Sequence, residues 1–251
     1  MTFSYDWQAS LAALVLTILL AAIGRKLVFM VPAFKQTLAE NREANRPKFA
    51  NERFKPVILF NQKLGLGLNL AFFIVLMPFF TSLRTEPVLT TLWHVVLVLM
   101  VYDFFYYLMH RFLFHGKGYF RRVHAVHHQA RRPTSVDAQL VHRTETSMGI
   151  GLYFLTIAGL GLAMGQTFSV ATIVLTLLIY TQLNQFNHVH VQLHRFPYNT
   201  LNWIADMHAV HHIDMYRGNY ATITLLFDWL GGTLDRGAES PVQRPQAQAQ
   251  E

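Results

Sequence analysis

Five long apolar runs constrain the fold more than any other feature of this 251-residue sequence. Each run approaches the roughly 20 residues that an α-helix needs to cross the hydrocarbon core of a membrane. Hydrophobic residues make up 52% of the chain and charged residues only 14%, a balance unlike that of a soluble domain. We therefore predict an all-α integral membrane helical bundle with about five spans, near residues 7–24, 64–83, 88–109, 148–165 and 167–186.

The spacing of the runs predicts how the chain is divided. Only Gln166 separates the last two runs, so residues 148–186 are expected to form a tight helical hairpin. The first run has no basic segment before it and no small-residue cleavage site after it, so we interpret it as a retained anchor. The predicted parts are an N-terminal anchor with a basic connection (1–63), a membrane-embedded domain (64–236) and a disordered polar tail (237–251).

Lysine and arginine residues predict the orientation, because they collect in the cytoplasmic loops of membrane proteins. With the N-terminus outside, the cytoplasmic segments would be 25–63, 110–147 and 187–251, and of the chain's 21 Lys and Arg residues only Arg84 would lie outside. The C-terminus and a histidine-rich helical cap would then be cytoplasmic. This distribution accounts for the net charge of +7 through contact with a lipid membrane, so no nucleic-acid partner is expected.

The pentapeptide HAVHH occurs twice, at 124–128 and at 208–212, and each copy places three histidines at helical spacing. Residues at i, i+3 and i+4 of an α-helix share one face, so each copy presents three imidazoles together. Neutral imidazole binds iron, zinc and copper, and six such nitrogens are enough to begin a site for two metal ions. The chain has no cysteine, which excludes thiolate ligands. The predicted ligands are His124, His127, His128, His208, His211 and His212.

Two further histidines, His110 and His115, follow the third apolar run. Positions i and i+5 lie about 140° apart on a regular α-helix, so these rings can converge only if the helix ends or distorts there. Asp103 lies seven residues before His110 and therefore on nearly the same helix face. A carboxylate inside an apolar span usually has a partner, and we expect Asp103 to support the site by accepting an N–H from a histidine ligand of another segment.

The segments DFFYYLMHRFLFH, HAVHH and MHAVHHIDMYRGNYATITLLFDWLGGT together resemble the fatty acid hydroxylase/sterol desaturase superfamily of integral membrane di-iron enzymes. The likeness covers most of residues 100–235. The three histidine boxes of that family match His110/His115, His124/His127/His128 and His208/His211/His212. His188 matches an additional family histidine, and His142 is a weaker match because Arg143 stands where the family usually has proline. The segment after the third box departs from the usual family sequence: Ala221 stands where the family usually has glycine.

The resemblance implies a function. Two iron ions held by histidines, which zinc can replace in a purified protein, would use O2 to hydroxylate or desaturate a C–H bond of a fatty acyl, sterol or other isoprenoid lipid. The sequence contains no Rossmann glycine fingerprint, so a separate electron-transfer protein must act as external electron donor. The basic residues available to dock an acidic carrier are Arg121, Arg122, Arg131 and Arg132.

Two other classes of protein remain open at this stage. A histidine-rich membrane metal transporter should carry its ligands at midplane depth, which only His94 and Asp103 approach. A zinc-dependent membrane hydrolase would need a general base such as Glu145, and the sequence has no H-E-x-x-H motif. Lone histidines are most often hydrogen-bonded or surface residues, and this is the expectation for His94, His190 and His194.

Overall fold

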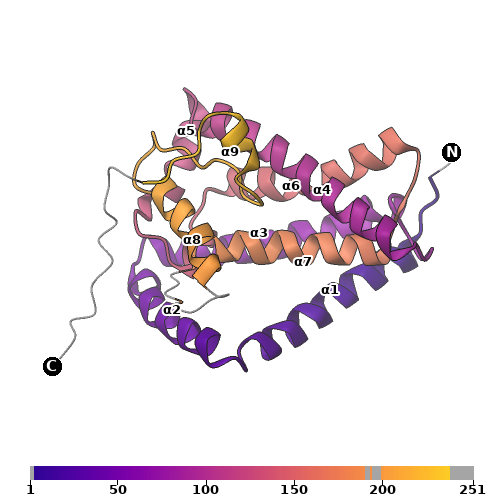
Figure 1. Ribbon diagram of the computed structural model, residues 1–251, viewed down its shortest axis with the longest axis horizontal. Helices are drawn as coiled ribbons and strands as arrows, with labels where there is room; N and C mark the ends of the chain where they lie inside the picture. The colour runs from indigo at the N-terminus through magenta and orange to yellow at the C-terminus, as the bar shows by residue number, and fades with distance from the viewer. Residues whose placement is uncertain (1–2, 190–192, 194–198, 238–251) are drawn as a thin grey trace.

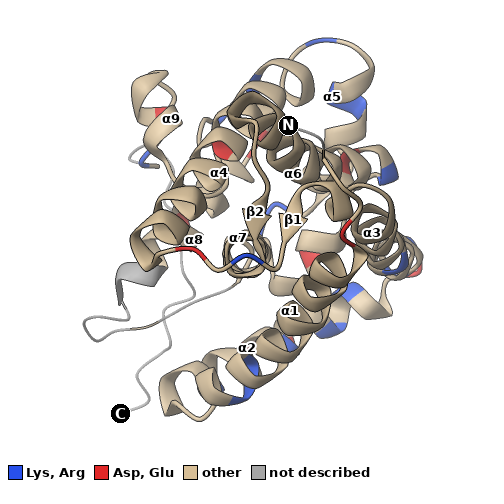
Figure 2. Ribbon diagram, turned by 90° about the vertical axis from the view of Figure 1, so that its right-hand side faces the viewer, with Lys and Arg blue, Asp and Glu red and all other residues tan. Residues whose placement is uncertain are grey.

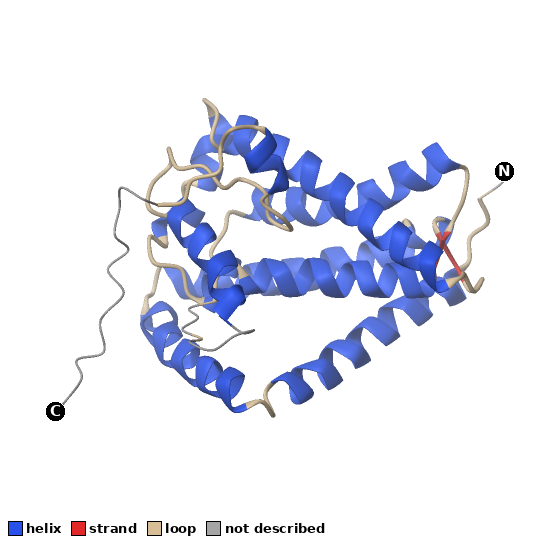
Figure 3. Ribbon diagram, in the orientation of Figure 1, coloured by secondary structure: helices blue, strands red, loops and turns tan. Residues whose placement is uncertain are grey.

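The computed structural model describes residues 3–189, 193 and 199–237. Five apolar helices lie along the long axis of the molecule, and shorter helices gather at one end (Figure 1). The N-terminus lies at the opposite end, beside the only strands in the described part of the chain (Figure 3). The long helices are α1 (Trp7–Val28), α3 (Phe54–Val75), α4 (Val88–Leu108), α6 (Arg143–Met164) and α7 (Val170–Phe186).

The end away from the N-terminus is built from connections between the long helices and from the chain that follows α7, and we call it the cap. It contains the helices α2 (Pro32–Ala50), α5 (Tyr119–His124), α8 (Asn199–His211) and α9 (Leu226–Leu230). The described elements also include the 3-10 turns Met77–Phe79, His127–Gln129 and Ser135–Gln139. The prediction of a histidine-rich helical cap on a helical bundle is confirmed.

Four helices are long and apolar enough to cross a membrane: α1, α3 with its following turn, α4 with its continuation to Phe114, and α6. The fifth apolar helix, α7, is shorter than these four and has 17 residues. At 1.5 Å per residue it is about 25 Å long, shorter than a hydrocarbon core of roughly 30 Å. It packs against α1 and α4 and buries Ile173, Val174 and Leu177, so its inner face meets protein.

The surface of the long helices is apolar, as expected of helices in lipid. On α1 the side chains of Leu19, Ile23 and Leu27 are exposed, and only residues near its N-terminus are buried. The interior is filled largely by aromatic rings, among them Tyr102, Tyr153 and Phe154. The chain is a multi-pass integral membrane protein: lipid covers the apolar side chains that a soluble protein would bury.

The hairpin predicted for 148–186 is present as α6 and α7. Gly165 ends α6 with φ of 62°, a left-handed conformation that glycine adopts at little cost. The turn after it contains β2 (Phe168–Ser169), which pairs in parallel with β1 (Thr81–Ser82) from the α3–α4 connection. His94 lies nearby and is bonded to Glu86 and Gln166, so it is an ordinary hydrogen-bonded histidine, as predicted.

Two predicted boundaries differ from the structure. Within the predicted basic connection of segment 1–63, the structure has a 19-residue helix, α2, that begins at Pro32. The second apolar helix begins at Phe54, ten residues before the predicted span, so the proposed domain boundary at 63/64 falls inside α3. Most of the predicted disordered tail, residues 238–251, lies outside the described residues.

Candidate metal centre

A π-helix brings His110 and His115 together. Residues Met109–Phe114 continue α4 in this wider form, and the N–H of His115 donates to the carbonyl of His110 at 2.9 Å, an i to i+5 bond. The additional residue in the turn rotates the two side chains onto one face, and their ring centroids lie 5.0 Å apart. The predicted distortion is confirmed, and its form is a π-turn within the continuing helix.

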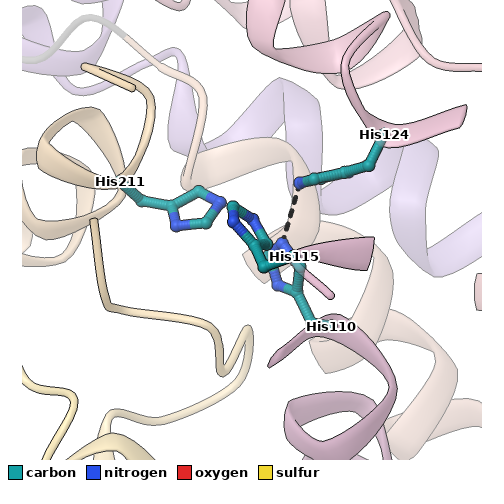
Figure 4. Close-up of side chains that lie close together, drawn as sticks. All are labelled: His110, His115, His124 and His211. Carbon is teal, nitrogen blue, oxygen red and sulfur yellow. Dashed lines mark hydrogen bonds between the residues drawn. The ribbon is translucent and has the colours of Figure 1, made fainter. Parts of the chain in front are cut away.

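Eight of the predicted ligands form two groups of four. Within each group, one ring nitrogen from every histidine lies within 4.8 Å of the others. Figure 4 shows the rings of one group pointing toward a common centre, with His124 approaching from α5 and His211 from α8. We call this the first histidine group: His110, His115, His124 and His211. The second histidine group consists of His127, His188, His208 and His212.

The spacing of the Nε2 atoms fits ligands around metal ions. In the first group His110 Nε2 lies 3.0 Å from His124 Nε2, and in the second His188 Nε2 lies 3.0 Å from His208 Nε2 and 3.1 Å from His127 Nε2. Metal–nitrogen bonds of about 2.1 Å place neighbouring ligands of an octahedral ion about 3.0 Å apart. The donor set and its spacing therefore fit a pair of metal ions.

His128 extends the first group. Its Nε2 atom lies 3.1 Å from Nε2 of both His124 and His211. Its ring also stacks on His212 of the second group, with centroids 5.0 Å apart. His128 therefore stands between the two groups, and the eight box histidines and His188 are gathered in one centre.

The opposite ring nitrogen, Nδ1, holds most of these rings in place. In six of the nine rings Nδ1–H donates to a fixed oxygen, which leaves the Nε2 lone pair free to face the centre. In the first group the acceptors are the carbonyls of Tyr220 (for His110, 2.6 Å), Met215 (for His115, 2.9 Å) and Gly218 (for His211, 2.7 Å) and the carboxylate of Glu145 (for His124, 2.8 Å). In the second they are the carbonyls of Leu140 (for His127, 3.2 Å) and Asn184 (for His188, 3.0 Å).

Burial keeps the cap histidines neutral, the form that binds metal. It lowers the pKa of His115 to about 4, of His128 to about 3 and of His188 to about 4. Burial also lowers the pKa of the remaining cap ligands well below the usual value, and the neighbouring imidazoles add to this effect: His124, His127, His208, His211 and His212.

Each HAVHH copy serves both groups, which the helical-face argument did not anticipate. In the first copy α5 ends at His124, and the chain turns before the 3-10 segment that carries His127. His124 therefore joins the first group and His127 the second. In the second copy His211 joins the first group, while His208 and His212 join the second. Neither group is assembled from one pentapeptide.

Asp103 is fully buried, and its hydrogen bonds differ from those predicted. Within the described chain it accepts no histidine N–H. Instead Oδ1 accepts the backbone N–H groups of Thr222 and Ile223, at 2.9 and 2.8 Å, and Oδ2 accepts the backbone N–H and hydroxyl of Thr224, at 3.0 and 2.9 Å. Asp103 can therefore support the histidines only through the backbone of residues 222–224. That it supports the metal site stays a prediction.

A second buried carboxylate, Asp228, holds the preceding residues of the same loop. It accepts the backbone N–H groups of Tyr220 and Ala221, both at 2.8 Å. Five consecutive N–H groups are thus bound by two carboxylates. We call residues 218–224 the supporting loop, because the carbonyls of Gly218 and Tyr220 accept from His211 and His110. Sequence reasoning missed Asp228, whose only signal was its place in the divergent motif.

The sequence contains three further histidines that were considered beside the boxes: His142, His190 and His194. His142 is in neither group: it precedes α6, and its Nδ1 accepts the backbone N–H of Thr144 at 3.2 Å. His190 and His194 lie outside the described residues. Within the described chain the two groups lie where the long helices meet the cap, not midway along the spans as a transporter site requires.

A cavity of about 650 Å³ adjoins the second group, and His127, His188 and Glu145 lie on its wall. Its volume is within the range of sites that hold small molecules. Glu145 was considered in the sequence only as a general base for a hydrolase. In the structure it connects the two parts of the site, because its carboxylate binds His124 and faces the cavity.

Comparison with known proteins agrees with this geometry. The family model described as fatty acid hydroxylase matches residues 95–233, which contain all nine clustered histidines. Very-long-chain aldehyde decarbonylase GL1-8 of Oryza sativa subsp. indica is 27% identical over 205 residues, covering 76% of this chain and 71% of the relative. Methylsterol monooxygenase 2-2 of Arabidopsis thaliana is 30% identical over 146 residues, covering 55% of this chain and 50% of the relative. No solved structure matches. The chain belongs to the fatty acid hydroxylase family of lipid-modifying membrane enzymes.

Proposed function

We propose that this protein is a membrane di-iron oxygenase that hydroxylates or desaturates a C–H bond of a lipid-like substrate, using O2 and electrons from a separate protein. The observation that carries the proposal is the pair of four-histidine groups, in which Nε2 atoms as close as 3.0 Å face one another. Bound iron would supply the oxidising chemistry. The residues of the chain hold the histidine rings in position, keep them neutral and shield the site from water.

The division of labour among these residues follows from their contacts. The supporting loop and Glu145 fix the rings of the first group, and the carbonyls of Leu140 and Asn184 fix two rings of the second. The cavity reaches the second group at His127 and His188, so a lipid held there would present a C–H bond to that side of the centre. Burial of the rings keeps bulk water from the ligands.

We further propose that the cap faces the cytoplasm and receives the electron-transfer protein. Lys and Arg lie on the cap elements α2 and α5, while the strand end carries Arg84 (Figure 2). The positive-inside rule favours this orientation. Exposed Arg122 and its half-buried neighbour Arg121 offer an acidic carrier a complementary surface close to His124.

Oxygen incorporation with the purified protein tests the proposal. Metal analysis should give two iron ions per chain, and a single turnover of the reduced protein with lipid and ¹⁸O2 should place the label in the lipid or give a desaturated lipid with labelled water. His127→Ala and His211→Ala should each lose metal and turnover together. Product formed without O2 would support a hydrolase instead, and a well-folded protein with at most one metal would contradict the di-iron assignment.

A further inference from the structure

The chain around α9 runs along α4 and then returns to the cap. The N–H of Asn219 donates to the carbonyl of Thr233 at 3.1 Å, so the segment between them leaves and rejoins the cap at one place. Within this segment the ring of Phe227 packs on that of Phe104 in α4, with centroids 5.4 Å apart. We call residues 219–233 the return loop. It contains α9 and most of the supporting loop.

The part of α4 that the return loop contacts lies at membrane depth. Between Val88 and His110 the chain has only one Asp, Glu, Lys or Arg residue, Asp103. A hydrocarbon core of roughly 30 Å covers about 20 residues of a helix, so a span that begins at Val88 extends beyond Asp103 and Phe104. Arg111 follows this apolar stretch, and Asp103 lies about 12 Å before it along the helix. The return loop therefore meets α4 inside the apolar layer.

The backbone of the return loop is bonded within the protein. Irregular backbone can lie at membrane depth only where its polar groups find such partners. Asp103 and Asp228 together accept the N–H groups of residues 220–224. The helix that follows, α9, begins with the N–H of Leu226 bonded to the hydroxyl of Thr224 at 3.2 Å. The two buried carboxylates thereby allow non-helical backbone to enter the apolar layer.

The outer face of α9 is apolar and exposed. Leu226, Trp229 and Leu230 are 43%, 66% and 63% exposed. They continue the apolar surface of α4, where Phe104 and Phe105 are exposed. In two perpendicular views α9 lies against α4 at the edge of the bundle (Figure 1 and Figure 2). Lipid covers the exposed rings of α4, and tryptophan is enriched where a membrane meets water, so lipid is the partner that fits this face.

We propose that the return loop is a re-entrant segment of the membrane, with α9 in the leaflet on the cap side and its outer face in lipid. Contact with lipid anchors the supporting loop, because Asp228 belongs to α9 and binds the backbone N–H groups of Tyr220 and Ala221. That loop in turn holds His110 and His211. The return loop is thus a positioning segment for the first histidine group, and its place in the membrane does not depend on the reaction that the enzyme catalyses.

Fluorescence quenching tests where α9 lies. Replacing Trp7, Trp93 and Trp203 by Phe leaves Trp229 as the only tryptophan of the chain. The zinc-loaded protein would be placed in nanodiscs of phosphatidylcholine that carries bromine either near the headgroup or near the end of one acyl chain. We expect bromine near the headgroup to lower the emission at least about twofold, bromine near the chain end to lower it less, and iodide in the water to have little effect.

Two control proteins calibrate the signal. Trp93, kept as the only tryptophan, is exposed on α4 near the strand end, and bromine in the lipid should quench it. Tyr216→Trp in a chain without other tryptophans places the ring in the cap outside the return loop, where Tyr216 is 82% exposed, and iodide should quench it. Quenching of Trp229 by iodide without quenching by bromine would place α9 in water. Protection from both quenchers would place it against protein, such as a second copy of the chain or an electron carrier. Either result overturns the proposal.

Trp229→Gln combined with Leu230→Gln tests the anchoring. Polar side chains on the outer face of α9 weaken its contact with lipid, so in chelator competition the first histidine group should bind zinc about tenfold more weakly while the second is unchanged. Leu89→Gln with Trp93→Gln is the matched control, because both residues are exposed on α4 near the strand end, and it should keep both metals. Trp229→Phe, which retains the apolar contact, should also keep both. Unchanged zinc binding in the α9 variant, or equal loss from both groups, would refute the anchoring.

Discussion

Replacing Asp103 by asparagine should weaken one half of the metal centre selectively. The change exchanges one carboxylate oxygen for an N–H2 group, which cannot accept a hydrogen bond. Oδ1 and Oδ2 each accept two hydrogen bonds from Thr222, Ile223 and Thr224, so two of the four are lost whichever oxygen is exchanged. A donor then faces a backbone N–H in the supporting loop.

The size of the effect follows from the kind of bond lost. A hydrogen bond to a charged group contributes about 1.5–3 kcal/mol, and relaxation of the loop recovers part of that. Changes of this kind in the surroundings of metal ligands typically weaken metal binding by about 10–100-fold. The loop holds His110 and His211 through the carbonyls of Tyr220 and Gly218. The first group should therefore weaken, while the second retains its metal.

Chelator competition followed by metal analysis measures the two affinities. At a chelator concentration where the wild type keeps two metals, Asp103→Asn should keep about one, and the oxidised carbon of the product should not change. Asp228→Asn should behave alike, because it releases the other end of the loop. Equal loss from both groups, no loss at all, or a shifted oxidation position with full metal content would refute the reasoning.

Three further predictions concern single residues. His142→Ala should leave metal content unchanged and cost about 1 kcal/mol of stability in thermal unfolding, because its Nδ1 caps the first turn of α6. Since burial lowers the pKa of His115 and of His188 to about 4, the unfolded chain takes up protons that the folded chain does not. The metal-free protein should lose up to about 1.4 kcal/mol per pH unit per histidine as the pH falls from about 6.5 toward 4, and a pH-independent melting temperature would refute this. Gly218→Ala should reduce metal in the first group, because its Cβ would collide with a backbone carbonyl, whereas Gly67→Ala, which has open space, should not.

The sequence contained the parts of the site whose signals are local. Apolar run length predicted the helical membrane bundle, and the paired pentapeptides with His110, His115 and His188 predicted all nine clustered histidines. The family was recognisable because the three boxes occur in order with apolar runs between them. The five-residue spacing of His110 and His115 predicted that the helix must end or distort for the two rings to converge. It did not predict that the distortion is a π-helix.

What the sequence could not provide depends on contacts between distant segments. Asp103 bonds to residues about 120 positions later, and helical periodicity can place it on a face but cannot name a partner there. Division of the first pentapeptide between two groups depends on where α5 ends, which no capping signal marked. Glu145 carried no metal-binding motif, and only the fold places it against His124.

The two ends of the bundle are held in different ways. At the strand end, β1 pairs with β2, and Glu86, His94 and Gln166 connect the α3–α4 and α6–α7 turns. The cavity lies toward the other end, between helices that the cap joins through longer segments. Around the cavity the helices are tied by side chains: Asn61 of α3 donates to the carbonyls of Gln139 and Val141 and accepts from Thr146 of α6. One substitution can therefore remove ties at the histidine end, whereas the backbone pairing at the strand end does not depend on any single side chain.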